Sequence, residues 1–245
     1  MTRPFEACSH IDIGGTKYPY LNDDSPFIAY QRGGTFFVAQ PLEYKSEDFD
    51  VIPVPLMMTD EWDIINEDPD FIDELRSTPK DHVFNFMGQT SYAGREVFRD
   101  LNLPEYVFQE TAPVYNLEPS VKRAVLKDFL RVIARAKFVF CPRGIGSSSF
   151  RAYQSLMAGS IPIITGMNDY PFKKEIDWDS FCLRGGEGRS WKQIAEQNRP
   201  EIDRLTSMAS CMSEDEYQKM RSLGMLFWDN YCRHDELYKK LEALV

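Results

Sequence analysis

A glycine- and serine-rich loop at residues 142–149 (PRGIGSSS) is the part of the sequence best suited to chemistry. It follows an apolar run and precedes a helical pattern, so it ends at the N-terminus of a predicted helix. Free N–H groups there suit a phosphate, glycine lets the backbone approach it, serine can cap the helix, and arginine can bind phosphate through two hydrogen bonds. The residues with these properties are Arg143, Gly144, Ser147, Ser148, Ser149 and Arg151.

The loop taken alone has other interpretations. It can be an ordinary turn between a strand and a helix, because it matches neither G-x-x-x-x-G-K-[ST] nor G-x-G-x-x-G. It can also belong to a serine hydrolase that uses one of the serines at 147–149. That interpretation lacks the G-x-S-x-G pattern, and the chain holds only 3 histidines to serve a serine.

The elements around the loop predict a parallel sheet. Apolar runs without alternation are separated by helical patterns, which is typical of a sheet covered on both faces. Ligands bind at the carboxyl ends of the strands in such sheets, and the loop lies at such an end. The predicted strands are 82–87, 106–109, 137–141 and 161–165, and the predicted helices are 95–101, one from Pro119 and one up to Ala158, where Gly159 ends it.

The first 78 residues have a different pattern, with short strands at 9–13, 27–30, 35–39 and 50–54. An acidic stretch from Asp60 to Pro79 follows, with a short helix predicted at 71–75. We therefore predict two lobes, residues 1–78 and 79–245, with a boundary near Thr78-Pro79. The last helix of the second lobe can pack back on the first.

Composition excludes some classes of protein. The net charge of −10 argues against binding to nucleic acid or to an anionic membrane surface. The 5 cysteines are odd in number and include no C-x-x-C pair, which favours reduced thiols over zinc or a disulfide framework. No charged-then-apolar leader and no run of 18 apolar residues occur. A cytoplasmic protein is the simplest expectation, although a soluble piece of a membrane-anchored parent would look the same.

The region from residue 138 to residue 181 carries a longer pattern. Its residues are Cys141-Pro142-Arg143-Gly144, Ser149, Arg151, Gly159, Ile161-Pro162, Asp169, Pro171-Phe172, Ile176-Asp177-Trp178 and Phe181. This pattern resembles the exostosin family of glycosyltransferases, known as family 47. Upstream, Phe86-Met87-Gly88 followed by Arg95 is similar to the family's F-x-G…R segment, and residues 9–14 (SHIDIG) and 50–53 (DVIP) are similar to two shorter family elements.

The resemblance implies a GT-B fold, with two Rossmann-like lobes facing a cleft. The second lobe would bind a nucleotide-sugar donor, such as UDP-xylose, UDP-galactose or UDP-glucuronic acid, and the small first lobe would bind a glycan acceptor. The implied activity is that of an inverting hexosyl- or pentosyltransferase. No cofactor and no essential metal are expected. The D-x-D triplets at 48–50, 68–70 and 177–179 are attributed to chance in a chain with 38 acidic residues.

An inverting transfer needs a base for the acceptor hydroxyl. His10 and Asp12 lie at the end of the first predicted strand, and alternation puts them on the same side of it. Asp12 is the first choice because a carboxylate accepts the proton directly, and His10 is the alternative. Asp12 can instead be a turn residue before Gly14-Gly15.

The remaining donor-site candidates are Gly88, Arg95, Gln154 and Asp169. Arg95 can reach the diphosphate or lie on a helix surface, and Asp169 can bind a donor hydroxyl or stabilise a turn. The family pattern has Glu where this chain has Gln154, and an amide accepts ribose hydroxyl groups without charge assistance. A nucleotide-sugar-binding module without catalysis is therefore the alternative function.

Overall fold

The computed structural model of the protein describes residues 6–8, 10–13, 16–19, 29–32, 35–38, 50–56, 59–91, 94–112, 117–144, 148–167, 170–185 and 191–243. For the strands that precede Ile52, only the backbone is described.

The described elements before residue 54 are short strands. Four of them form a sheet in the order β1-β4-β5-β6, antiparallel except for the pair β5–β6, and β2 and β3 form a hairpin. Links as short as the two residues between β2 and β3 allow only antiparallel pairing, because a parallel connection needs about a dozen residues or more. The strands are β1 (Glu6–Cys8), β2 (His10–Ile13), β3 (Thr16–Pro19), β4 (Ala29–Arg32), β5 (Thr35–Val38) and β6 (Asp50–Pro53).

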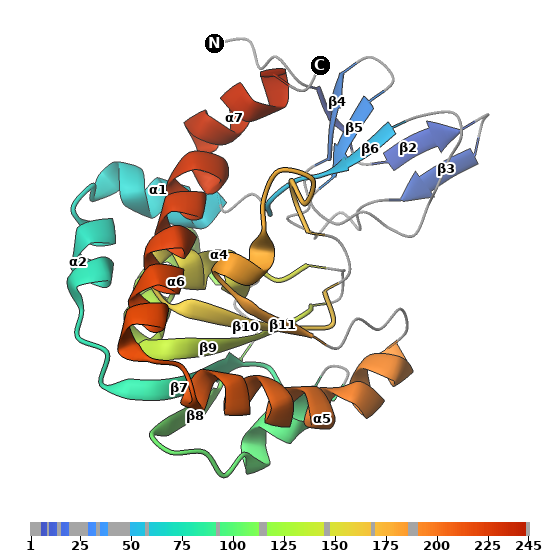
Figure 1. The fold of residues 1–245 in the computed structure, drawn as a ribbon. Coiled ribbons are helices and arrows are strands. Elements are labelled where there is room, and N and C mark those ends of the chain that lie inside the picture. Colours follow the sequence, from blue (N-terminus) through green and yellow to red (C-terminus); the bar gives the residue numbers. More distant parts are fainter. Residues whose placement is uncertain are drawn as a thin grey trace.

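The second lobe is built on a parallel sheet in the order β11-β10-β9-β7-β8 (Figure 1). Along its middle strand, Phe138 and Phe140 enter one hydrophobic cluster, whereas Val139 and Cys141 enter another on the opposite face. The sheet is thus apolar on both faces, and the predicted α/β class is confirmed. Its strands are β7 (His82–Gly88), β8 (Tyr106–Glu110), β9 (Ala136–Pro142), β10 (Ile161–Thr165) and β11 (Leu183–Gly185).

Helices cover both faces of this sheet. One face packs against α3 and α4, and the other packs against α5 and the short helix η1 (Figure 1). Helix α4 is buried on all sides from Ala152 to Met157, and Gly159 ends it with a φ of +66° that glycine adopts readily. The elements are η1 (Arg95–Asp100), α3 (Pro119–Ala134), α4 (Phe150–Met157), η2 (Trp178–Ser180), α5 (Trp191–Ser210), α6 (Glu214–Phe227), the π-helical turn η3 (Trp228–Cys232) and α7 (His234–Ala243).

Two helices precede the sheet, α1 (Thr59–Glu67) and α2 (Phe71–Ser77). The sequence predicts only part of α2. Both pack against α3, and Ile64, Phe71 and Leu75 are buried in the same cluster as α3 and α4. This packing fits a transition between the lobes ahead of α1, whereas the boundary near Thr78-Pro79 stays a prediction.

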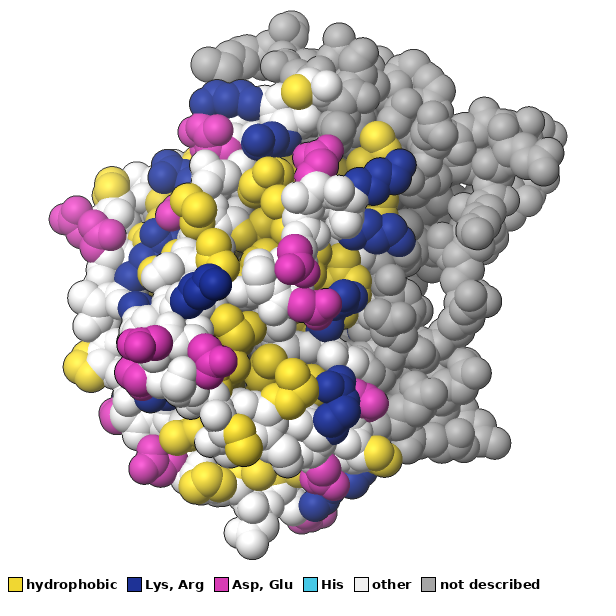
Figure 2. Space-filling model, in the orientation of Figure 1, with side chains coloured by type: hydrophobic (Ala, Val, Ile, Leu, Met, Phe, Trp, Pro, Cys, Tyr) yellow, Lys and Arg dark blue, Asp and Glu magenta, His cyan; other side chains and the backbone are white. Residues whose placement is uncertain are grey.

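The described surface is mixed in charge. Figure 2 shows acidic and basic side chains interspersed with apolar ones over the described part of the visible face. Among the described helices, none combines the length and the apolar character needed to cross a membrane.

Candidate functional site

The carboxyl ends of β7 and β9 border a topological switch point. From β7 the chain continues to β8 on one side of the sheet, whereas from β9 it continues through α4 to β10 on the other. Connections that leave in opposite directions open a crevice, and open α/β sheets bind ligands there. Gly88 ends β7 and Pro142 ends β9. The predicted loop at 142–149 therefore lies at the edge where a ligand is expected.

Arg151, in the first turn of α4, extends its guanidinium group over Gly88. A Cβ atom added at Gly88 would lie 2.2 Å from Arg151 Nη2, so any other residue at this position would displace the end of this side chain. The guanidinium carbon lies 5.1 Å from the ring centroid of Phe86 and 5.8 Å from that of Phe129. The structure thus brings together two predicted site residues that are 63 positions apart in the sequence.

The charge of Arg151 is poorly matched by its surroundings. Its Nε and Nη1 atoms are buried and have no hydrogen-bond partner. Burial lowers the pKa of Arg151, and burial raises the pKa of the neighbouring Cys141 thiol to about 12, so the thiol stays neutral and supplies no counter-charge. The side chain as a whole is half-buried, so a ligand can still reach it. These features suit the binding of an anion.

The N-terminus of α4 lacks the serine cap that the sequence predicts. Ser149 occupies the N-cap position, but its side chain makes no capping hydrogen bond. The Ser148 hydroxyl lies 3.5 Å from the Tyr153 hydroxyl instead. Tyr153 comes from the same helix and is fully buried, and Ser148 is buried beside it. Ser147 lies outside the described residues.

Arg95 has a structural role that the sequence does not predict. Its Nη2 atom donates to the backbone oxygen of Arg143 at 2.6 Å and to that of Pro142 at 3.2 Å. Its Nη1 atom donates to the Gln89 backbone oxygen at 3.3 Å. Arg95 therefore joins the segments that follow β7 and β9.

The loop after β9 is held to its neighbours by backbone hydrogen bonds. The Arg143 N–H donates to the Thr165 oxygen at 3.0 Å, and the Gly144 N–H donates to the Ser148 oxygen at 3.1 Å. Both Arg143 and Gly144 are half-buried at the sheet edge. Their position fits the predicted donor site, and a role in binding stays a prediction.

Three other predicted residues are placed only in part. His10 and Asp12 lie on β2. In the backbone register of the hairpin, Asp12 stands opposite Lys17 of β3. The side chains of His10 and Asp12 lie outside the described structure. Asp169 is itself outside the described residues. The assignment of the base and of a donor hydroxyl contact therefore stays a prediction.

Gln154 of α4 contacts a residue of α1. Its Nε2 atom donates a hydrogen bond to Glu61 Oε1, across 93 residues of sequence. Both side chains are buried, with exposed fractions of 7% for Gln154 and 5% for Glu61. Burial raises the pKa of Glu61, and the hydrogen bond from Gln154 acts against this shift. Sequence analysis misses Glu61, because its acidic type places it among ordinary surface charges.

Residues of the acidic triplets have partners within the protein where their side chains are described. Asp177 caps η2, Asp179 pairs with Arg184 at 2.6 Å, and Asp68 pairs with Lys127 at 3.0 Å. Within the described part of the chain, no cluster of three or more His, Cys, Asp or Glu side chains is arranged to hold a metal ion. Independence from metal stays a prediction.

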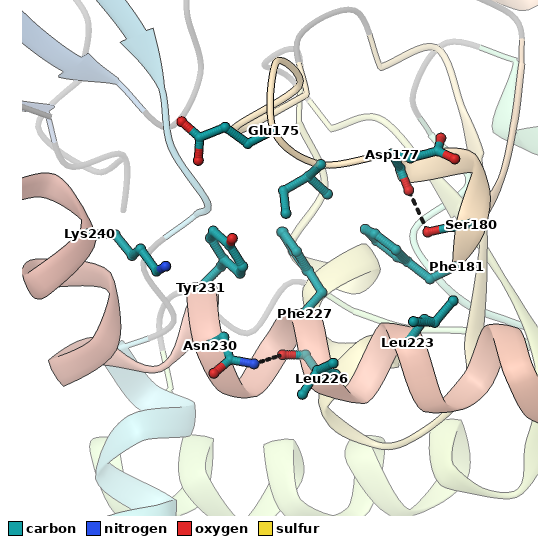
Figure 3. Close-up of a pocket in the computed structure, with 11 residues that line it drawn as sticks. Glu175, Asp177, Ser180, Phe181, Leu223, Leu226, Phe227, Asn230, Tyr231 and Lys240 are labelled. Atoms are coloured by element: carbon teal, nitrogen blue, oxygen red, sulfur yellow. Dashed lines mark hydrogen bonds between the residues drawn. The ribbon is translucent and has the colours of Figure 1, made fainter. Parts of the chain in front are cut away.

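A pocket of about 340 Å³ lies between residues 175–181 and the segment formed by α6, η3 and α7 (Figure 3). Phe227 stacks between Phe181 and Tyr231, with centroid distances of 4.9 and 5.3 Å. Lys240 Nζ lies 4.7 Å from the Tyr231 centroid. Since these ring faces already have neighbours, the pocket offers no open aromatic platform. Among the predicted site residues whose side chains the structure describes, none lines it.

Known proteins resemble this chain in sequence and in fold. The model of the Exostosin GT47 domain matches residues 28–195. The structure is similar to that of the pneumococcal O-GlcNAc transferase GtfA, solved with UDP and GlcNAc, with a TM-score of 0.41 and 12% identity over 82% of this chain. It is also similar to the C-terminal domain of the glycosyl transferase group 1 family protein LpcC from Francisella tularensis, with a TM-score of 0.35 and 16% identity over 66% of this chain and 90% of that one. The chain spans 40% of the length of the pneumococcal protein.

The family match runs from β4 into the first residues of α5, so it includes the crevice between β7 and β9 and the helix that carries Arg151. The expected GT-B type goes with membership of this family. The described part of the first lobe differs from a Rossmann-like lobe in its largely antiparallel strands. The resemblance noted in the sequence is thus confirmed over most of its length, and the chain belongs to the exostosin GT47 family of glycosyltransferases.

Proposed function

We propose that this protein is an inverting glycosyltransferase that moves a hexosyl or pentosyl group from a uridine diphosphate donor to a hydroxyl group of a glycan. The single observation that carries the proposal is the Arg151 guanidinium beside Gly88. Buried nitrogen atoms without partners cost free energy, and an anion in the crevice would remove that cost. The leaving group of this reaction is such an anion, a nucleoside diphosphate.

The same geometry suits the chemical step. Negative charge grows on the diphosphate as its bond to the sugar breaks, so fixed positive groups there stabilise the transition state more than the ground state. Arg151 and the N–H groups at the start of α4 would supply this stabilisation, and Arg143 would add to it. In this mechanism neither a cofactor nor a metal ion is essential.

The acceptor hydroxyl has to lose a proton to a base in the first lobe. We assign this role to Asp12, because a carboxylate can accept the proton directly, and His10 is the alternative. Both residues belong to β2, a short strand separate from the donor lobe. Donor binding and proton transfer would therefore depend on different lobes.

A second candidate function is a nucleotide-sugar-binding module without catalysis. It is favoured by the Gln154 amide, which donates to Glu61 and has no charge of its own. Both functions require the same donor site, and they differ only in turnover.

Donor binding is tested by thermal unfolding with uridine diphosphate, in the presence and absence of a chelator. A ligand at about 100 times its Kd adds roughly 2.7 kcal/mol to the free energy of unfolding, which raises the melting temperature. We expect this rise for uridine diphosphate and for UDP-sugars, and we expect the chelator to leave it intact. No shift with any nucleoside diphosphate would refute the donor site.

Catalysis is tested with Asp12→Asn. Asparagine keeps the size and the turn-forming ability of aspartate but cannot accept a proton at neutral pH. We expect turnover to fall by a factor of about 10²–10⁴ while donor affinity is nearly unchanged. If His10→Gln loses turnover and Asp12→Asn keeps it, the base is His10. If the unmodified protein binds donors but turns none over with a panel of glycan acceptors, the binding module is the better description.

A further inference from the structure

The short helix η1 contacts the ends of three neighbouring strands through two arginines. Arg95 and Arg99 lie four residues apart on η1, and Arg95 holds the segments after β7 and β9. Arg99 reaches the end of β8, where its Nη2 atom donates to the two carboxylate oxygens of Glu110 at 2.8 and 2.7 Å. Strands β8, β7 and β9 are consecutive in the sheet. The two arginines therefore fasten neighbouring strand ends at the edge that forms the crevice.

Arg99 and Glu110 share a third partner, the hydroxyl group of Thr90. This hydroxyl donates to Glu110 Oε1 and accepts from Arg99 Nη2 at 2.7 Å. Thr90 is buried, whereas the side chains of Arg99 and Glu110 have exposed fractions of 49% and 44%. The hydrogen bond from Thr90, and after it that from Arg99, lowers the pKa of Glu110. Glu110 is therefore ionised at neutral pH, and each hydrogen bond of this network is charge-assisted.

The network adjoins the backbone that borders the Arg151 guanidinium. Glu110 stands opposite Gly88 in the register of β7 and β8, and the Thr111 N–H donates to the Gly88 oxygen at 3.3 Å. Thr90 follows Gly88 by two residues, so Gly88 is tied to the network both along the chain and across the sheet. Arg151 Nη2 lies so close to Gly88 that a Cβ atom there would come within 2.2 Å of it. A shift of this backbone therefore shifts the guanidinium as well.

As a way to stabilise the fold, the network is weak. Water screens an ion pair that is about half exposed, and such pairs contribute little to folding. A matched pair lies at the other end of β7, where Arg135 donates from Nε and Nη2 to Asp81. Its side chains have exposed fractions of 50% and 46%. The chain thus contains a control for the loss of an exposed ion pair away from the crevice.

We propose that Thr90, Arg99 and Glu110 are positioning residues of the anion site. Their network fixes the segment 88–90, and through Gly88 it fixes the place of the Arg151 guanidinium for the diphosphate group of the donor. The inference rests on the proposed function. It goes further because it assigns a role to three side chains outside the loop at 142–149, and because it names the diphosphate as the part of the ligand that depends on them.

The test measures affinity by calorimetry for uridine diphosphate and, by competition with it, for inorganic pyrophosphate. Thr90→Val keeps the branched shape of the side chain but removes the hydroxyl group, so the ion pair loses its contact with the segment. We expect both probes to bind about tenfold more weakly, because both carry the diphosphate group. Thr90→Ser keeps the hydroxyl group, so it should bind both probes to within about twofold of the unmodified protein.

The two exposed ion pairs give a matched comparison. Arg99→Gln should weaken the binding of both probes about fivefold, whereas Arg135→Gln should leave both affinities unchanged. Urea unfolding should show similarly small losses of stability in the two variants, since the two pairs are equally exposed. If Thr90→Val does not fold, Arg99→Gln decides by itself, because it changes an exposed group.

Arg151 supplies a readout that a purely structural role does not change. Arg151→Lys keeps the charge but removes the planar guanidinium that lies over Gly88. In this background Thr90→Val should lose most of its effect on uridine diphosphate, because the network acts through the guanidinium. Losses that add in full would mean that the network acts independently of Arg151, which overturns the inference.

The outcomes separate two failures. If the unmodified protein does not bind uridine diphosphate, the proposed function fails and this inference fails with it. If it binds uridine diphosphate but Thr90→Val and Arg99→Gln keep full affinity, the inference alone is wrong. Equal losses of affinity in Arg99→Gln and Arg135→Gln would show that an ion pair acts through the fold as a whole, which also contradicts the inference.

Discussion

The basic side chains at the two ends of α4 differ in their hydrogen-bond partners. At its C-terminus, Lys80 Nζ donates to the Ala134 oxygen at 2.6 Å, the Ser160 hydroxyl at 3.0 Å and the Ala158 oxygen at 3.3 Å. Arg221 Nε donates to the Gly159 oxygen at 2.9 Å. Carbonyl groups at a helix end need such donors.

At the N-terminus of α4 the balance is reversed. Arg151 lies in the first turn, where the positive end of the helix dipole disfavours a cation. Two of its nitrogen atoms are buried without partners. A buried basic side chain therefore indicates stability where its partners are protein atoms, and it indicates a ligand where they are missing. Three variants can break or sharpen this comparison.

Arg151→Ala should have the largest effect. Removal of two charge-assisted hydrogen bonds, at about 1.5–3 kcal/mol each, should weaken uridine diphosphate binding roughly 10²- to 10⁴-fold. The free energy of unfolding without ligand should change little, because loss of contact with the Phe86 ring is offset by removal of a poorly matched charge. Calorimetry and urea unfolding measure the two effects. A large loss of stability with unchanged affinity would mean that Arg151 has a structural role, like the basic side chains at the other end of α4.

Lys80→Met should show the reverse pattern. It leaves two backbone oxygens and a hydroxyl without their donor, so the free energy of unfolding should fall by about 2–4 kcal/mol. Affinity for uridine diphosphate should be unchanged, since Lys80 lies at the opposite end of α4. Weaker nucleotide binding in a folded Lys80→Met protein would contradict the separation of the two ends.

Lys80 also predicts a dependence on pH. Burial lowers its pKa from 10.5 to about 7. Between these two values the unfolded chain binds more protons than the folded one, so the contribution of Lys80 to stability rises with pH. The stability deficit of Lys80→Met should therefore widen from pH 7 to pH 10 in urea unfolding. A deficit that narrows over this range would show that the charged form is the one that the fold favours.

Gly88→Ala should have the smallest effect. Its Cβ atom would lie 2.2 Å from Arg151 Nη2, so the guanidinium would have to shift within the crevice. We expect uridine diphosphate to bind about tenfold more weakly. In calorimetry, Gly88→Ala/Arg151→Ala should bind no more weakly than Arg151→Ala alone, because the first change acts through the second residue. Fully additive losses would mean that Gly88 contacts the ligand by another route.

The sequence predicts the parallel sheet well, because period and composition alone reveal buried strands such as 137–141 and 161–165. The crevice was also predictable in outline, since parallel strands end at a common edge. Helix α1 was not predicted. Its inward positions include Glu61 beside Ile64 and Ile65, and a carboxylate at an inward position breaks the apolar pattern that reveals a helix.

The partners of single side chains depend on geometry that spacing does not contain. Arg95 was expected to bind a diphosphate or to lie on a surface; it joins backbone segments at Gln89 and Pro142, which spacing does not reveal, and contact with a diphosphate stays a prediction. The contact between Gln154 and Glu61 spans 93 residues, and nothing local predicts it. The hairpin of β2 and β3 did carry a local signal, since the two glycines at 14–15 are typical of a tight turn.

The burial of α1 and α2 has a practical consequence for anyone who divides this protein. A fragment that starts at Lys80 would lack Ile64, Phe71 and Leu75, and the faces of α3 and α4 that these residues cover would meet water. Such a fragment would be prone to aggregate, although it would keep every strand of the parallel sheet. Exchange of the second lobe between related proteins should therefore cut the chain before Val54, which is already buried in the core of that lobe.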